Sequence, residues 1–143
     1  MKLNKDCVRS IMLLCESNLG IKNNLNLKDF LNSKELKYSE DDIKYTLEKL
    51  NETSYLNMHL QCGSNEIAEV TISSLTWQGH QFLDTIRDPK VWATTKKIAS
   101  KLESVSITIL SNIATGVINH FIDKVMDKSS VWTKIDKFYE SLS

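Results

Sequence analysis

Three residues in the middle of the chain have the types and spacing for acid–base chemistry. His80 and Asp84 are four positions apart, which would bring an imidazole and a carboxylate together on a helix. General acid–base catalysis would also need a third group and a pocket. Arg87 lies three positions after Asp84, a spacing that favours a structural ion pair. Because the sequence also has no Gly-rich phosphate loop or nucleophile elbow, we predict no catalytic residue and no enzyme activity.

The cysteine and histidine residues do not form a metal-binding pattern. His59 and Cys62 are three positions apart in an expected strand, so their side chains would point to opposite faces. No paired spacing of zinc type occurs, and Cys7 and Cys15 fit as small core residues of a first helix. We predict neither a metal nor a cofactor. The count of three cysteines, without a disulfide framework, indicates a reducing cytoplasm.

The charges are unevenly distributed. The chain has 18 basic and 18 acidic residues, yet it has no Lys or Arg from Leu50 to Ile86. Its C-terminal third is net basic. Proteins bind DNA largely by neutralising phosphates with cations, so one lysine cluster is the candidate nucleic-acid site, although a solvated face is the other interpretation. That cluster, expected on one helix, is Lys90, Lys96, Lys97 and Lys101.

The apolar spacing predicts the elements around these residues. A helix is expected over about 4–18, a connector or short strand over 23–27, and one or two helical turns over 28–32. Ser39 and the acids after it predict a helix over 40–52. Two apolar segments around the turn at 63–65 predict a hairpin, and Thr76 caps the next helix. The predicted fold is mainly α with a small β-hairpin: a winged helix-turn-helix core over 1–88 and a C-terminal helical extension over 89–143 that packs on it.

The surface that would contact DNA in such a fold is acidic. Helix 40–52 is expected to present four acids and two lysines outward, and the hairpin adds two acids. A recognition helix lies in the major groove between phosphate chains, so these carboxylates would oppose binding. A solvated helix without a ligand is one interpretation; we predict a protein-binding surface. Its residues are Asp41, Asp42, Lys44, Tyr45, Glu48, Lys49, Glu52, Glu66 and Glu69.

Three separated motifs carry a family resemblance. They are LTxxGHxFLDxIR at 75–87 followed by Trp92, MKLNxDxVR at 1–9, and YSExxIxYxLxxL at 38–50. Together they resemble the small phage and prophage proteins known as domain of unknown function 2513. The resemblance implies a mobile-element origin and a winged-helix fold, and it implies no activity.

A long helix over about 106–127 is expected to pack on two sides. Residues 104–122 contain no charged residue, but their Asn, His, Ser and Thr favour an amphipathic helix over a membrane span. One apolar stripe is Ile107, Leu110, Ala114, Val117, Ile118, Phe121 and Val125. A second apolar stripe, on the opposite side of the helix, is expected to meet another copy of the chain, giving a homodimer. It consists of Ile109, Ile113, Gly116 and His120.

The function predicted from these observations is non-enzymatic. We expect a phage- or prophage-type accessory protein in the bacterial cytoplasm that binds a host or phage protein through the acidic surface and interferes with host machinery. The alternative is a winged-helix transcriptional regulator that binds DNA through the lysine cluster. The larger aromatic residues are expected in the helical core: Trp77, Trp92, Trp132, Phe138 and Tyr139.

Overall fold

The chain forms two compact units, residues 1–87 (unit 1) and residues 88–143 (unit 2). The structure is a computed structural model that describes residues 1–127 and 129–142, and the side chains of 129–132 lie outside this description. In the described part of the chain, no helix is long and apolar enough to cross a membrane.

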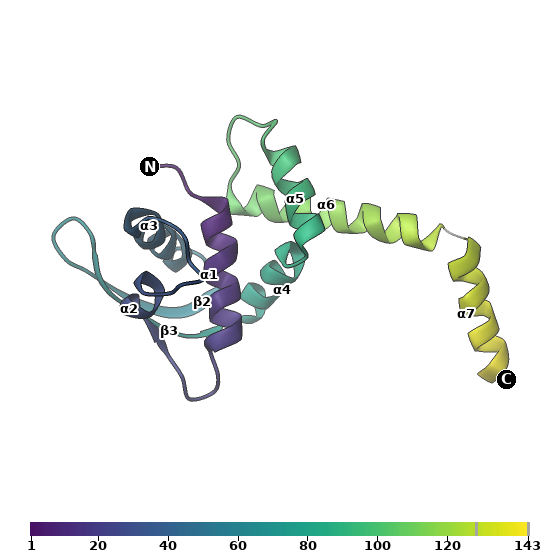
Figure 1. Cartoon of the computed structure of the whole chain (residues 1–143), viewed down its shortest axis with the longest axis horizontal. Helices are drawn as coiled ribbons and strands as arrows, with labels where there is room; N and C mark the ends of the chain where they lie inside the picture. Colours follow the sequence, from purple (N-terminus) through teal and green to yellow (C-terminus); the bar gives the residue numbers. More distant parts are fainter. Residues whose placement is uncertain (128, 143) are drawn as a thin grey trace. The chain divides into compact units, whose positions relative to one another are not determined.

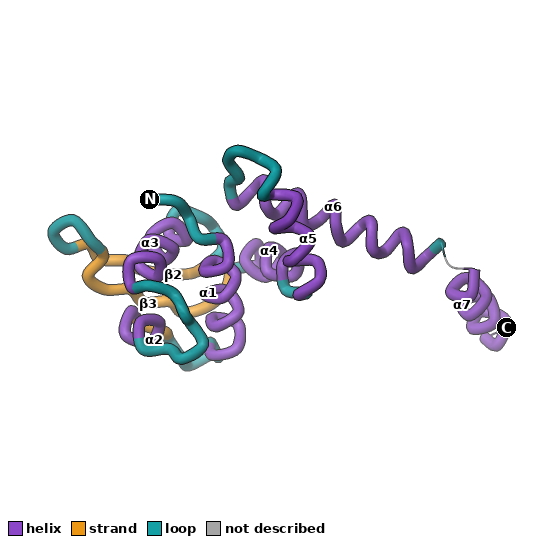
Figure 2. Tube along the Cα trace, turned by 45° about the horizontal axis from the view of Figure 1, so that its top comes forward, coloured by secondary structure: helices purple, strands orange, loops and turns teal. Residues whose placement is uncertain are grey.

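Unit 1 combines helices with a small antiparallel sheet (Figure 1). Its elements are α1 (Lys5–Asn18), β1 (Leu25–Asn26), α2 (Leu27–Leu31), α3 (Glu40–Asn51), β2 (Leu56–Cys62), β3 (Ile67–Leu75) and α4 (Trp77–Ile86). The strand order is β1-β3-β2, and Leu25 of β1 pairs with Ile72 of β3. Figure 2 shows the strands as one sheet beside α1, α2 and α3. The predicted combination of helices with a small hairpin is therefore confirmed, with β1 as a third strand.

Local sequence signals determine where the helices of unit 1 begin. Asn4, Asn26, Ser39 and Thr76 occupy the N-caps of α1, α2, α3 and α4, and each side chain accepts a hydrogen bond from the N–H three positions later. The first N–H groups of a helix have no partner within the helix, so these caps stabilise its start.

The core of unit 1 is formed where α1, α3 and α4 pack on the sheet. Apolar residues recur every three or four positions on each helix and at inward positions of the strands. The largest fully buried apolar side chains of unit 1 are Val8, Ile11, Met12, Phe30, Leu47, Leu50, Val70, Ile72, Leu83 and Ile86.

The start of α4 packs directly on the backbone of residue 55. Tyr55 accepts a hydrogen bond from Thr76 N through its carbonyl oxygen (2.9 Å), and its ring stacks on Phe82 with centroids 4.6 Å apart. A Cβ atom at Gly79 would lie 2.9 Å from the Tyr55 carbonyl carbon and overlap the carbonyl oxygen. Only glycine allows this close approach of helix and hairpin.

Unit 2 contains α5 (Pro89–Ala99), α6 (Ile107–Met126) and α7 (Ser129–Leu142). Asp88 caps α5, and Pro89 occupies its first turn, where a missing N–H costs nothing. Four buried side chains of α5 and three of α6 form the core of this unit: Val91, Trp92, Thr95, Ala99, Leu110, Ala114 and Val117.

Some predictions for the C-terminal helices are wrong. Val125, expected in the inward stripe of α6, is half exposed because the buried contact with α5 includes only the first half of α6. Of the aromatic residues expected in the core, Trp92 is buried, whereas Trp77, Phe138 and Tyr139 are exposed. The Trp132 side chain lies outside the described residues.

Candidate functional site

The outward side of α3 is acidic and lies beside the hairpin. Ile43, Thr46, Leu47 and Leu50 face the core, which leaves Asp41, Tyr45, Glu48 and Glu52 on the opposite side at helical spacing. Three of these four residues are carboxylates, and all three are exposed.

Both lysines of α3 are held by acids. Lys44 Nζ lies 2.8 Å from Glu40 Oε1 and 3.1 Å from Glu66 Oε2, so it joins the helix to the residue that precedes β3. Lys49 Nζ lies 3.3 Å from Glu52 Oε2. Hydrogen bonds to these carboxylates raise the pKa of both lysines. The cations are therefore already paired within the surface.

We define the acidic face by eight residues that the structure brings together on α3 and at the hairpin: Glu40, Asp41, Lys44, Tyr45, Glu48, Lys49, Glu52 and Glu66. Five carboxylates and two ammonium groups give it a net charge of −3 at neutral pH. Glu40 was missed as a surface residue, although its i,i+4 spacing to Lys44 is a sequence signal for this pair.

Two residues predicted for this surface have other contacts. The carboxylate of Asp42 is half buried and lies 3.5 Å from Asn4 Nδ2 at the start of α1. Glu69 accepts hydrogen bonds from Leu27 N (3.3 Å) and Val70 N (3.0 Å), which directs its carboxylate toward the start of α2. We therefore place both outside the acidic face.

The predicted lysine cluster is only partly on a helix. Lys90, Lys96 and Lys97 are exposed on α5, and Lys96 Nζ lies 5.9 Å from the centre of the Trp92 ring. Lys101 is outside the helix, because α5 ends at Ala99 and Ser100 is its C-cap. The expectation that Lys101 shares a helix face with Lys90 is wrong. A further set of exposed lysines on α2 and its connection to α3 was missed: Lys28, Lys34 and Lys37.

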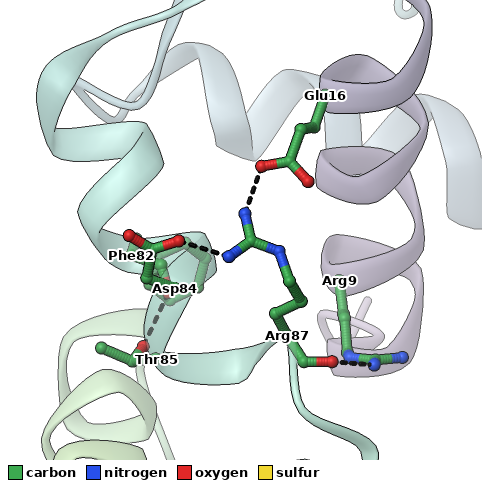
Figure 3. Close-up of polar contacts among 6 residues, drawn as sticks. All are labelled: Arg9, Glu16, Phe82, Asp84, Thr85 and Arg87. Carbon is green, nitrogen blue, oxygen red and sulfur yellow. Dashed lines mark hydrogen bonds and ion pairs between the residues drawn. The ribbon is translucent and has the colours of Figure 1, made fainter.

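Two of the three residues considered for acid–base chemistry, Asp84 and Arg87, belong to a structural network between α1 and α4 (Figure 3), and His80 does not. The guanidinium of Arg87 pairs with both Asp84 and Glu16, and these contacts raise its pKa. Arg9 of α1 donates to the carbonyl oxygens of Ile86 (2.8 Å) and Arg87 (2.6 Å) at the end of α4. Asp84 thus forms an ion pair with Arg87, as its spacing predicted. Arg9 and Arg87 both connect α1 to α4.

A shallow cleft of about 280 Å³ lies beside this network, and its lining includes Glu16, Ser73 and His80. Glu16 is paired with Arg87, and His80 is exposed. Within residues 1–127 and 129–142, no group of three or more His, Cys, Asp or Glu side chains is arranged to hold a metal ion.

Three of the four residues predicted for self-association line an apolar groove of about 320 Å³ between α5 and α6, and Ile109 does not. Ile113, Gly116 and His120 contribute from α6, and Thr94 and Ile98 contribute from α5. The second stripe of α6 is therefore next to α5 and not opposite to it, because residues at this spacing are about a third of a turn from the buried stripe. Ile109 is 42% exposed.

Comparison with known proteins identifies the family. The family model described as hypothetical protein (DUF2513) matches residues 2–106, which include every helix and strand of unit 1 and α5. The chain belongs to this family. An uncharacterized protein of Haemophilus influenzae (strain Rd) is similar to it, with 28% identity over 123 residues that cover 85% of this chain and 99% of that protein. No solved structure matches the chain. The resemblance of the three motifs to the DUF2513 family is confirmed.

Proposed function

We propose that unit 1 is a winged helix-turn-helix domain that uses its acidic face to bind a basic protein. The element order α1-β1-α2-α3-β2-β3 and the strand order β1-β3-β2 support the fold assignment. In that arrangement α2 and α3 are the helix-turn-helix, α3 is the recognition helix, and the β2–β3 hairpin is the wing.

The observation that carries the proposal is the pairing of Lys44 and Lys49 inside the acidic face. A recognition helix that enters a DNA groove needs cations directed at phosphates. Here one lysine is held between Glu40 and Glu66, and the other is held by Glu52. The remaining outward groups are carboxylates and Tyr45, which suit a partner rich in Lys and Arg.

A surface of this charge can occupy the nucleic-acid site of a basic protein. We therefore place the protein among phage or prophage accessory proteins that act in the bacterial cytoplasm by interfering with host machinery. The partner is a host or phage protein with a basic binding surface. The shape of the domain positions the charges, and the function depends on the charges and not on the fold.

The test compares three versions of the immobilised full chain in lysate of a bacterial host. The face-reversed variant carries Asp41→Lys, Glu48→Lys and Glu52→Lys. A control carries the same charge change at the exposed acids Glu103, Asp123 and Asp127. We expect wild type and control to retain the same basic protein, heparin to displace it, and the face-reversed variant to lose it. Equal retention by all three versions would contradict the proposal.

DNA binding is the second candidate, and one specific observation favours it. Lys28, Lys34 and Lys37 are exposed on the helix-turn-helix segment before α3, where phosphates would lie in such a complex. The cluster of Lys90, Lys96, Lys97 and Lys101 adds further cations in unit 2. A regulator of this kind would show an affinity for duplex DNA that falls steeply as salt increases.

A further inference from the structure

The apolar groove in unit 2 is open along α6. A Cβ atom added at Gly116 would meet nothing within 4 Å, so the middle of the groove has room for another side chain. Ile98 at one edge is 40% exposed. An apolar groove of this kind favours binding of an apolar helix face.

The exposed sides of α6 carry no charged residue over its first sixteen positions. From Ile107 to Ile122 the helix contains no Asp, Glu, Lys or Arg, although only Leu110, Ala114 and Val117 are buried. Solvated helix faces normally carry charged residues, so the composition of α6 is that of a helix covered on more than one side.

The amphipathic helix α7 has an apolar stripe that could occupy such a groove. Ile135, Phe138, Tyr139 and Leu142 follow the i, i+3, i+4, i+7 pattern of one helix face. Phe138, Tyr139 and Leu142 are 62%, 66% and 67% exposed. The same chain thus contains both an open apolar groove and an uncovered apolar helix face.

One side of the groove is basic and one flank of the α7 stripe is acidic, whereas the other flank of the stripe carries Lys134. Lys90, Thr94 and Lys97 share one side of α5, and because Thr94 lines the groove, the two lysines flank it. Asp136 and Glu140 lie four positions apart along one flank of the α7 stripe. Placing the stripe in the groove can therefore bring carboxylates to the lysine side.

We propose that two copies of the chain form a symmetric dimer by exchanging α7, so that the stripe of each copy occupies the α5–α6 groove of the other. Three aromatic or aliphatic side chains of roughly 200 Å², two-thirds exposed, provide about 400 Å² for each helix. The exchange makes this contact twice, so the two α7 helices together would remove about 800 Å² of side-chain surface from water before the opposing groove surfaces are added, which brings the contact toward the roughly 1,200–2,000 Å² of a stable interface. A twofold exchange covers both apolar surfaces at once.

Crosslinking between two differently tagged chains tests the exchange. Both chains carry Cys62→Ser, which removes the exposed thiol; Cys7 and Cys15 are buried. One chain carries Ile113→Cys and the other Phe138→Cys, and a short bis-maleimide is added to the mixture. A control replaces Ile113→Cys with Thr115→Cys, on the side of α6 away from the groove. We expect a crosslinked heterodimer with Ile113→Cys and little with Thr115→Cys.

Three outcomes would overturn the exchange: no heterodimer, equal yields with the two α6 positions, or, for a further variant that carries both Ile113→Cys and Phe138→Cys in one chain, a crosslink only within that chain. The last result would mean that α7 covers the groove of its own chain. Sedimentation of wild type as a monomer at all concentrations would overturn it as well.

Charge insertion gives a second, independent readout. Ile113→Asp should weaken the dimer by about 100-fold in sedimentation, since it places an unpaired carboxylate in an apolar contact, whereas Thr115→Asp should leave it unchanged. If circular dichroism shows that Ile113→Asp has lost helix, Phe138→Asp replaces it, because Phe138 is exposed in the single chain. Equal dimer affinity for Phe138→Asp and wild type would refute the proposal.

Discussion

Lys44 connects α3 to the hairpin through Glu66, with 3.1 Å between Nζ and Oε2. The same ammonium group is paired with Glu40 one turn earlier on the helix. This contact joins α3 to the residue that precedes β3, and it pairs the Lys44 ammonium group within the acidic face.

Arg9 should contribute measurably to the stability of unit 1. Its guanidinium caps the end of α4 through two carbonyl oxygens, which have no partner within the helix. We expect Arg9→Ala to lower the free energy of unfolding by about 2 kcal/mol, and the thermal midpoint by about 10 °C. Lys5→Ala removes the same charge from α1 and serves as the control. Equal midpoints for the two variants would show that the carbonyl contacts contribute little.

Gly79 should not tolerate even a methyl group. Gly79→Ala places a Cβ atom against the Tyr55 carbonyl, and neither the helix nor the hairpin can move away without losing the stacking of Tyr55 on Phe82. We expect a loss of about 3 kcal/mol in denaturant unfolding. Gly20→Ala is a suitable comparison because a Cβ atom there would meet only Asn23 Nδ2, at 3.9 Å. A Gly79→Ala variant with the stability of wild type would contradict the packing described for α4.

Thr95→Val should stabilise unit 2. The Thr95 hydroxyl is fully buried and has no hydrogen-bond partner among the described residues. Valine has nearly the same shape and removes the cost of burying an unpaired hydroxyl, so we expect a gain of about 1 kcal/mol in denaturant unfolding. Thr108→Val, at an exposed position of α6, should change stability much less. A less stable Thr95→Val variant would mean that the hydroxyl is satisfied.

Stability should fall as the pH rises above 9. Burial raises the pKa of the Cys15 thiol from its ordinary value of 9.0 to about 12. Between these values the unfolded chain loses a proton that the folded chain retains, so the free energy of unfolding decreases by about 1.4 kcal/mol per pH unit for this thiol. Burial raises the pKa of Cys7 too, which acts in the same direction.

Denaturant unfolding at pH 8, 9 and 10 measures how steeply the free energy of unfolding falls with pH. Cys15→Ala should make this fall less steep, because about one proton fewer is released on unfolding. If wild type and Cys15→Ala lose stability at the same rate with pH, the thiol is not the source of the dependence.

Features that depend on neighbours in the sequence could be predicted, and those that depend on distant residues could not. Ser39 and Thr76 identified the starts of α3 and α4 because a cap acts within three positions. Asp84 and Arg87 were recognised as a pair for the same reason. Glu16, the other partner of Arg87, is 71 positions away, and no local pattern connects them.

The surfaces were the least predictable part. Helical spacing placed Asp42 outward, but its carboxylate lies at the start of α1, which only the packing of α1 on α3 decides. Trp77 has a large aromatic side chain of the kind usually found in a core. It nevertheless lies in the first turn of α4, on the side away from Phe82 and Leu83, and is exposed. The stripe of Ile113 and Gly116 was recognisable as apolar, whereas its position beside α5 required the structure.

The most direct test of the acidic face is the affinity of the full chain for a random DNA duplex, measured by fluorescence anisotropy across a range of salt concentrations. We expect weak binding by wild type at physiological salt, and a large gain when Asp41, Glu48 and Glu52 are changed to Lys. The control with Glu103, Asp123 and Asp127 changed to Lys should gain much less. Nanomolar binding by wild type that weakens in the face-reversed variant would rule out a protein-binding role for the acidic face and identify α3 as a DNA-reading helix.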